Sequence, residues 1–342
     1  MTLPKHLLGV DMAAADFALT AYDSETATYS KAQSFSNQPE GLEALQKYLD
    51  QHQMTPADTL FCMESTGVYV EPLAYYLAAK GYRVAIEAPH KTKRAFYPLG
   101  PKTDPLDSRQ IAEYAHRFFD QLPFWKPSEV IVEQLRVLLT TREHLVEQRT
   151  ANQNALQAIQ RKTVKTPPAE AAFTATIEHL KKQIQQLDRE IKDRSSDHPT
   201  FGPTMALIMS VPGAGFLLAS HLLTLSEGFT QPLEARKVAS HLGICPRPFQ
   251  SGISIRRKSK SRGGGPPRLR KLLFLAAMSS RKHQVSFKHY FLRKTQEGKA
   301  KRLVLNNIEN RLLKIICAVI RTRTPYIPGY RSVNPVLLQK VA

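Results

Sequence analysis

The sequence predicts an α/β domain followed by mostly helical segments, and three observations lead to this fold class. Over residues 1–125, short apolar runs alternate with amphipathic segments, which is typical of an α/β domain. Residues 130–193 lack glycine and carry a repeating apolar seam. Residues 247–302 hold 17 Lys and Arg against one acid, whereas residues 1–120 have a net charge of −4. We therefore expect three sections, 1–125, 126–198 and 199–342.

The elements of the first section follow from its apolar periodicity. Strands are expected at residues 7–10, 17–22, 59–63 and 82–86, with the first two forming a hairpin. Helices are expected at residues 40–52, 70–80 and 104–119. Gly81 closes the second helix, and Pro105 suits the first turn of the third.

The second section carries a heptad seam. Its apolar residues recur at spacings of 3, 4, 3 and 4, namely Ile177, Leu180, Ile184, Leu187 and Ile191. A break at residues 165–168 divides the segment into two halves. We expect a helical hairpin or coiled coil that projects and forms homo-oligomers. A helical bundle packed on its own domain is the alternative.

The third section should be mostly helical. Residues 201–226 are expected to form two helices around the turn VPGAG at 211–215, a helix-hairpin-helix-like segment. Such a turn either directs backbone amides at a phosphate or only connects the helices. A helix at 233–242, an extended stretch at 244–261 and helices at 268–278 and 301–320 complete the chain.

The charge balance predicts nucleic acid as the partner. The formal charge is +19, and clustered Lys and Arg neutralise phosphates and release counterions. An anionic membrane surface is disfavoured, because residues 263–267 break the basic stretch and it lacks a long amphipathic helix with a clean apolar face. No uncharged stretch reaches the roughly 18 residues that a membrane span needs. Without a signal peptide or paired cysteines, we expect a cytoplasmic protein. The candidate nucleic-acid contacts are Arg247, Arg256, Arg257, Lys258, Lys260, Arg262, Arg268, Arg270 and Lys271.

Four acids form a candidate metal site. Asp11 and Glu64 end predicted strands, while Asp104 and Asp107 are three apart and share a helix face. Together they would make an oxygen cage for one or two Mg²⁺ ions, which suits phosphodiester cleavage. The alternative is that Asp104 is an N-cap, Asp107 a favourable charge in the first helical turn, and the others ordinary strand-end acids.

These motifs carry a family resemblance. The segments LLGVDMAAADF, MESTGVYVEPLAYYLAAKGYRV and KTDPLDSRQIAEYA resemble the DEDD transposases of the insertion-sequence family numbered one hundred and ten. The segments SVPGAG, ASHLGICPRPFQSGIS and PRLRKLLFLAAM resemble the C-terminal transposase domain of the same family. The resemblance implies a ribonuclease-H-like (RuvC-like) N-terminal domain with Asp11, Glu64, Asp104 and Asp107 as metal ligands.

The basic stretch also holds candidate nucleophiles. It contains Ser251, Ser254, Ser259 and Ser261, and residues 245–278 include no His, Asp or Glu to act as a base. Nearby positive charge could favour attack by a serine alkoxide. Spacing alone does not choose among the four, and hydroxyls that only bind water or phosphate are the alternative. The family's nucleophile is the serine of the SG pair after the PR motif, which the resemblance places at Ser251.

The resemblance implies a recombinase guided by a structured bridge RNA that pairs with donor and target DNA. The serine would form a covalent phosphoserine link to DNA, and the metal-bearing acids would complete the site. Two other functions remain open on the residues alone. One is a metal-dependent junction nuclease that uses the acids and water, and the other is a non-catalytic RNA-binding scaffold.

Overall fold

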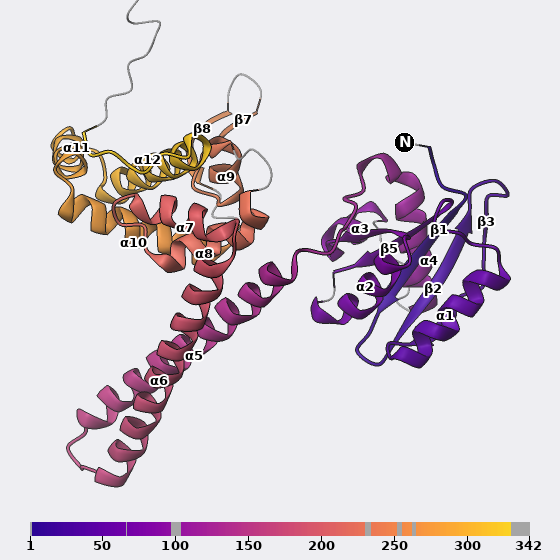
Figure 1. Ribbon diagram of the computed structural model, residues 1–342, viewed down its shortest axis with the longest axis horizontal. Coiled ribbons are helices and arrows are strands. Elements are labelled where there is room, and N and C mark those ends of the chain that lie inside the picture. The colour runs from indigo at the N-terminus through magenta and orange to yellow at the C-terminus, as the bar shows by residue number, and fades with distance from the viewer. Residues whose placement is uncertain are drawn as a thin grey trace, which may run out of the picture. The chain divides into compact units, whose positions relative to one another are not determined.

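The computed structural model describes residues 2–65, 67–96, 104–229, 234–251, 255–261 and 265–329. Within these ranges, the side chains of residues 104, 105, 247–251 and 255–261 are not described. The chain forms two compact units, Met1–Pro127 and Ser128–Ala342 (Figure 1). Each unit is considered by itself below.

The first unit is built on a mixed sheet with the order β3-β2-β1-β5-β6, and β4 also pairs with β2. Its central strand β1 is antiparallel to β2 and parallel to β5, which is in turn parallel to β6. The expected hairpin and strands are therefore confirmed. The bounds are β1 (His6–Met12), β2 (Asp16–Asp23), β3 (Thr28–Tyr29), β4 (Gln33–Ser36), β5 (Thr59–Glu64) and β6 (Arg83–Glu87).

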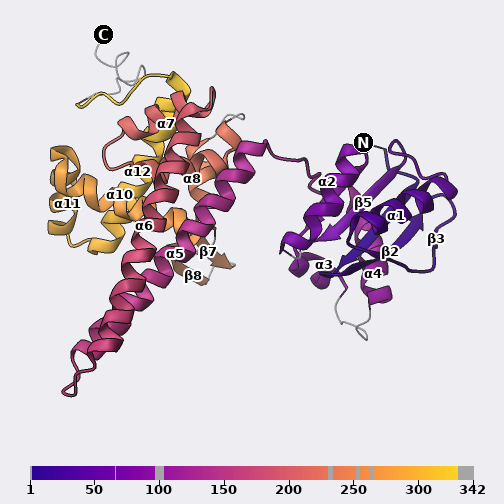
Figure 2. The same ribbon diagram turned by 60° about the horizontal axis from the view of Figure 1, so that its bottom comes forward.

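Helices cover both faces of this sheet (Figures 1 and 2). Alternate residues of β1 point to opposite faces, so Leu8 packs with the core that includes Leu45 and Leu73, and Leu7 packs with Ile111. The first core lies under α1 and α2, and the second lies under α4. The bounds are α1 (Pro39–Gln51), η1 (Gly67–Val70), α2 (Glu71–Ala79), α3 (Pro89–Ala95), α4 (Asp104–Arg117) and η2 (Phe119–Gln121).

A long helical hairpin opens the second unit. It consists of α5 (Val130–Gln160) and α6 (Pro167–Asp197), and Arg142 of α5 forms an ion pair with Asp188 of α6. Four of the five predicted seam residues are buried, and Leu187 is half-buried. Figures 1 and 2 show the tip of this hairpin extending beyond the other helices of its unit. The helical hairpin is confirmed, and its seam is filled by helices of the same chain.

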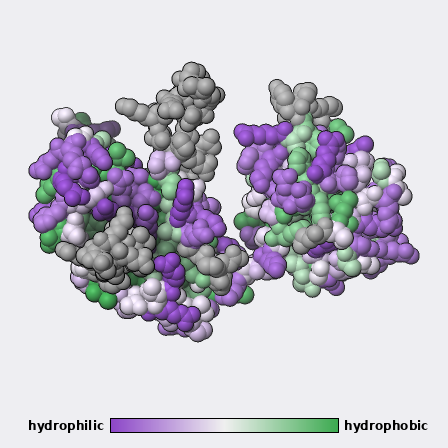
Figure 3. Space-filling model, turned by 90° about the horizontal axis from the view of Figure 1, so that it is seen from above, coloured by the Kyte–Doolittle hydropathy of each residue, from purple (hydrophilic) through white to green (hydrophobic). Residues whose placement is uncertain are grey.

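The remaining helices of the second unit pack with α5 and α6 around one core, which includes Leu218, Leu273 and Ile308 together with Leu135 of α5 and Ile191 of α6. The longest of these remaining helices, α12, packs against α7, α9, α10 and α11. The bounds are α7 (Phe201–Ser210), α8 (Phe216–Leu225), η3 (Glu227–Phe229), α9 (Ala235–His241), β7 (Pro246–Ser251), β8 (Ile255–Ser261), α10 (Pro267–His283), α11 (Val285–Gln296) and α12 (Lys301–Thr322). In Figure 3, hydrophilic residues cover much of the visible surface of this unit.

The VPGAG turn joins α7 to α8 and packs inside the second unit. Ser280 of α10 donates a hydrogen bond from Oγ to the carbonyl oxygen of Pro212, 2.7 Å away. Gly213 has φ +80°, and a Cβ there would lie 2.5 Å from the carbonyl oxygen of Ala276. The turn is therefore packed against α10 on the side of Gly213, whereas a Cβ at Gly215, the residue before α8, would meet nothing within 4 Å. Among the helices that the structure describes, none has the length and apolar character needed to cross a membrane.

Candidate active site

Two of the four predicted acids end neighbouring parallel strands. Val10 of β1 is paired with Met63 of β5, so Asp11 and Glu64 follow at the same level of the sheet. Asp11 shares a face with Gly9, and Glu64 shares that face with Cys62, because side chains alternate along a strand. This is the face covered by α4. Both acids are half-buried.

The direction of α4 is fixed by its contacts with the sheet. A Cβ at Gly9 would lie 2.2 Å from the carbonyl oxygen of Ser108, so the helix backbone touches β1. The Ser108 hydroxyl lies 2.8 Å from that of Thr20, the residue paired with Gly9. Further along the helix, His116 lies beside Tyr22. Since Tyr22 pairs with Leu7, α4 runs antiparallel to β1.

The start of α4 therefore lies toward the carboxyl end of β1. Asp104 precedes Ser108 by four residues, about 6 Å along a helix, and Asp11 follows Gly9 by two residues, about 7 Å along a strand. Asp107 is half-buried in the first turns of the same helix. The backbone thus brings all four positions toward one edge of the first unit. Among the described side chains, which do not include that of Asp104, no three His, Cys, Asp or Glu are gathered as a metal site.

Glu64 has neighbours that the sequence analysis missed. The Thr92 hydroxyl of α3 hydrogen-bonds to its carboxylate. Glu87 ends β6 beside Glu64, is 2% exposed, and forms an ion pair with Lys91 at 2.9 Å. The hydrogen bond to Glu87 raises the pKa of Lys91. The position of Glu87 after an apolar run, the same signal that identified Glu64, could have identified it.

The donor chemistry of this edge fits a hard divalent cation. Carboxylate oxygens are the ligands that Mg²⁺ prefers, and the four candidate positions all carry them. Softer metals would need thiolates or imidazoles. Cys62, which shares this face, is fully buried, and its burial raises the pKa of its thiol far above the ordinary value. Oxygen donors are therefore the chemistry that this edge can offer.

Ser251 lies in the second unit, at the end of β7. The expected extended stretch forms the antiparallel hairpin β7–β8, in which Ser251 pairs with Ile255, and its side chain lies outside those described. The base of the hairpin is held by α12. Asn306 and Asn310 both donate hydrogen bonds to the carbonyl oxygen of Ile244, at 3.1 and 3.3 Å. This carbonyl lies two residues before β7, so the strand starts from a fixed point.

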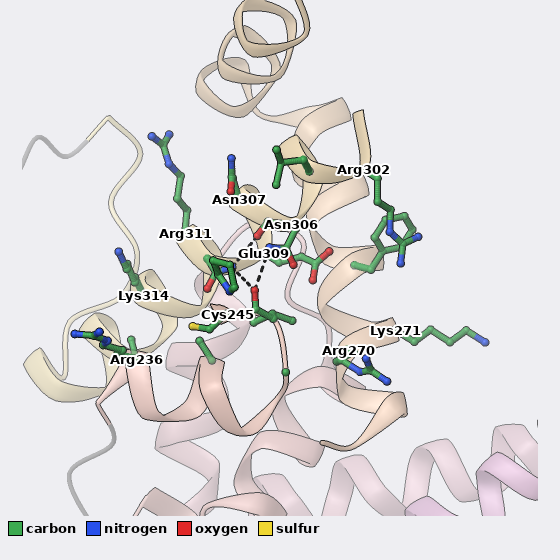
Figure 4. A pocket seen from close by; sticks show the side chains of 18 of the residues that line it. Arg236, Cys245, Arg270, Lys271, Arg302, Asn306, Asn307, Glu309, Arg311 and Lys314 are labelled. Carbon is green, nitrogen blue, oxygen red and sulfur yellow. Dashed lines mark hydrogen bonds between the residues drawn. The ribbon is translucent and has the colours of Figure 1, made fainter. Parts of the chain in front are cut away.

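The predicted nucleic-acid contacts separate into three groups. The first group lies outside the described part of the structure. Arg262 is not among the described residues, and the side chains of five other residues are not described, namely Arg247, Arg256, Arg257, Lys258 and Lys260. Arg268 forms ion pairs with Glu143 at 2.5 Å and Glu147 at 3.0 Å, so its guanidinium contacts acids of α5. Arg270 and Lys271 line a cavity beside α12 (Figure 4).

This cavity has a volume of about 1650 Å³ and receives side chains from α9, α10 and α12. Figure 4 shows its cationic residues around Glu309, which is 6% exposed. Most of these cations were missed in the sequence, because they are far apart along the chain and only converge in the fold. The cations are Arg236, Arg270, Lys271, Arg302, Arg311 and Lys314.

Comparisons with known proteins match both units. A family model described as a transposase, of the DEDD IS110 type, matches residues 8–164. A second, described as the transposase IS116/IS110/IS902 family, matches residues 205–292. Pilin gene-inverting proteins of Moraxella lacunata and Moraxella bovis are each 29% identical over 320 residues, covering 91% of this chain and 96% of theirs. An uncharacterised 44.8 kDa protein of insertion element IS116 from Streptomyces clavuligerus is 26% identical over 165 residues, 47% of this chain and 41% of its own.

Proposed function

Since the chain belongs to the IS110 family of DEDD transposases, we propose that this DNA transposase cuts and rejoins strands through the Ser251 hydroxyl under the guidance of a structured RNA. The backbone arrangement of the first unit, in which β1, β5 and the start of α4 bring Asp11, Glu64, Asp104 and Asp107 toward one edge, is the observation that supports the proposal. Antiparallel β1 and β2 beside parallel β5 and β6 support a ribonuclease-H-like fold for this unit.

The acidic edge would hold the metal. Asp11, Glu64, Asp104 and Asp107 would bind Mg²⁺, which supplies positive charge to stabilise the phosphate oxygens during strand exchange. Thr92 would orient Glu64, because its hydroxyl already hydrogen-bonds to that carboxylate. The ion pair between Glu87 and Lys91 neutralises one further buried carboxylate beside this edge.

The serine step conserves the number of phosphate ester bonds. The Ser251 oxygen forms a bond to phosphorus and loses its proton, while the bond from phosphorus to a deoxyribose oxygen breaks and that oxygen takes up a proton. Attack by the hydroxyl of another strand end on the phosphoserine reverses these changes. Rejoining therefore needs no external energy source.

The activity described for two relatives supports strand rejoining over simple hydrolysis. Two relatives that align over nearly their whole length are described as inverting a pilin gene. Inversion of a DNA segment requires each cut strand to be joined to a new end. A nuclease that uses water would leave the ends open, so the recombinase explains the relatives better than the junction nuclease or the non-catalytic scaffold.

The cationic second unit would hold the guide RNA and the donor and target DNA in the cytoplasm. Residues 247–302 carry a net charge of +16, which exceeds what a single short duplex contact requires. Base pairing with the RNA would then select the DNA sequence. We further propose that the chain works as a homo-oligomer; because α5 and other helices of the same chain fill the seam of α6, other surfaces would have to form the contact. Light scattering of the purified protein tests the oligomeric state.

A trapping experiment tests the chemistry. Stopped reactions with labelled DNA should contain a covalent protein–DNA adduct, which Ser251→Ala abolishes and the exposed control Ser279→Ala retains. Asp11→Asn should lose strand exchange while still binding RNA, whereas the exposed control Asp120→Asn should remain active. A Ser251→Ala protein that recombines at the normal rate would overturn the nucleophile assignment. Cleavage without any adduct would favour the metal-dependent nuclease.

A further inference from the structure

We propose that the cavity beside α12 binds an unpaired stretch of one nucleic-acid strand, with Glu309 contacting a base and the surrounding cations contacting the phosphates. This inference rests on nucleic-acid binding by the second unit and goes beyond the proposed function by assigning a base-contacting site. The cavity adjoins the hairpin that carries Ser251, since Pro246, the first residue of β7, is among its lining residues.

Glu309 is a buried acid that faces the cavity without a partner. Its residue is 6% exposed and lines the cavity. Among the described residues, no group forms a hydrogen bond or an ion pair with its carboxylate. Burial raises the pKa of Glu309 to about 7, although Arg302 and Arg270 act in the opposite direction. The carboxylate oxygens of Glu309 therefore keep hydrogen-bonding capacity that a ligand in the cavity can use.

A second polar group in the cavity also lacks a partner. The Nε atom of Arg270 is buried, and none of the described residues accepts a hydrogen bond from it. Arg270 lines the same cavity as Glu309 (Figure 4). The cavity is therefore lined by a carboxylate without a hydrogen-bonded partner among the described residues, and the charges of Arg270 and Arg302 act on it.

These charges define the chemistry of the ligand. Six cations attract phosphate groups. A simple phosphate placed beside Glu309 would meet like charge, so the ligand needs both phosphates and N–H donors. Nucleotides combine these two features. The volume of about 1650 Å³ exceeds the roughly 300–1,000 Å³ of ordinary small-molecule sites, which favours a strand of several nucleotides over an isolated one.

The lining also offers surfaces for the flat faces of bases. Arg311 lies 3.8 Å above the centre of the Tyr290 ring, and Arg302 lies 4.8 Å above that of Phe274. Unpaired bases stack on such guanidinium planes. Leu303 is 51% exposed at the cavity and adds apolar contact area. In a duplex, the Watson–Crick edges of the bases are hydrogen-bonded to each other. A carboxylate can therefore hydrogen-bond to such an edge only if the base is unpaired.

The carboxylate predicts a base preference. Ionised Glu309 only accepts hydrogen bonds, and guanine presents two adjacent donors, N1–H and the N2 amino group, on its pairing edge. Glu309→Gln replaces one acceptor with a donor and keeps the shape of the side chain. The guanine preference should therefore disappear in this variant, with adenine or cytosine binding at least as well.

Fluorescence anisotropy with the full-length chain tests this preference. The probes are a short oligouridylate RNA and a short oligothymidylate DNA, each with or without one central guanine, at a pH of about 8.5, where Glu309 is ionised. The guanine should tighten binding about tenfold, since one bidentate base contact is worth about 1–3 kcal/mol. The RNA and DNA arms show which strand uses the cavity. Glu309→Gln should abolish the preference, and the exposed control Glu297→Gln should keep it.

The possible outcomes separate this inference from the proposed function. Equal binding of strands with and without guanine in both arms, or an unchanged preference in Glu309→Gln, overturns the base-contacting site alone. A duplex DNA probe serves as the reference and should bind equally to wild type and Glu309→Gln. Failure of the wild type to bind any RNA or DNA would instead contradict the proposed function itself.

Discussion

The hydroxyl oxygens of Thr20 on β2 and Ser108 on α4 lie 2.8 Å apart, and both residues are buried. This hydrogen bond connects the helix that carries Asp104 and Asp107 to the sheet that carries Asp11. It lies one helical turn from Asp104. The distance between Asp11 and the two acids of α4 therefore depends on the Thr20–Ser108 hydrogen bond, which includes no acid.

Thr20→Val tests this connection. The substitution leaves the Ser108 hydroxyl without its Thr20 partner, and we expect a loss of about 1–2 kcal/mol in the free energy of unfolding, measured with urea. The exposed pair of Thr26 and Thr28 has hydroxyls at the same distance of 2.8 Å. Thr26→Val should cost less than about 0.5 kcal/mol, because water replaces that hydrogen bond. Equal losses in the two variants would show that burial of the Thr20 bond contributes nothing.

Gly9→Ala should separate α4 from the sheet. The added methyl group would lie 2.1 Å from the backbone nitrogen of Ala112, and backbone atoms of a packed helix cannot yield as a flexible side chain would. We expect about 3 kcal/mol of destabilisation and loss of strand exchange. Gly215→Ala is the control, since a Cβ at Gly215 meets nothing within 4 Å and φ is −91°. Normal stability of Gly9→Ala would contradict the close packing of α4 on β1.

Thr92→Val should lower the rate of strand exchange with little effect on folding. Valine has the shape of threonine, but it cannot hydrogen-bond to Glu64, so the carboxylate loses its orientation. Partners of metal ligands typically contribute about 10-fold or more to affinity or activity. Thr92→Ser retains the hydroxyl and should restore the rate, whereas a Val variant with full activity and unchanged dependence on Mg²⁺ would exclude this role.

Glu309→Gln should stabilise the second unit at high pH only. The pKa of Glu309 is about 7 in the folded chain against an ordinary 4.5. Below pH 4.5 the group is protonated in both states, and as pH rises toward 7 the unfolded chain ionises first, so stability falls. The gain from glutamine should therefore approach an upper limit of about 3 kcal/mol near pH 8.5 and vanish near pH 4.5. Urea titrations at the two pH values measure it.

Local patterns predicted most elements that position the candidate site. The apolar runs that end in Asp11 and Glu64 located β1 and β5, and the Pro167–Pro168 pair marked the break between α5 and α6. The α3 helix was missed because its seven residues, PHKTKRA, have no apolar periodicity. Thr92, the residue of α3 that hydrogen-bonds to Glu64, therefore had no signal in the sequence.

Patterns that describe one helix do not identify its partner. The seam at residues 177–191 predicted that α6 packs on another helix, and the structure shows α5 of the same chain in that place. The cavity beside α12 could not be predicted for a related reason. Its cations come from positions as distant as Arg236 and Lys314, so a count of charge along the chain found only the contiguous basic block. Glu309 resembles any polar residue of an amphipathic helix until its surroundings are known.

The orientation of α4 has a consequence for how the first unit assembles. A helix carries partial positive charge at its amino end, and here that end lies toward the edge where the acids converge. The macrodipole offsets part of the repulsion between the carboxylates before any cation arrives. We therefore expect the protein to reach its native fold in the presence of a chelator, and to bind the proposed divalent ion only afterwards.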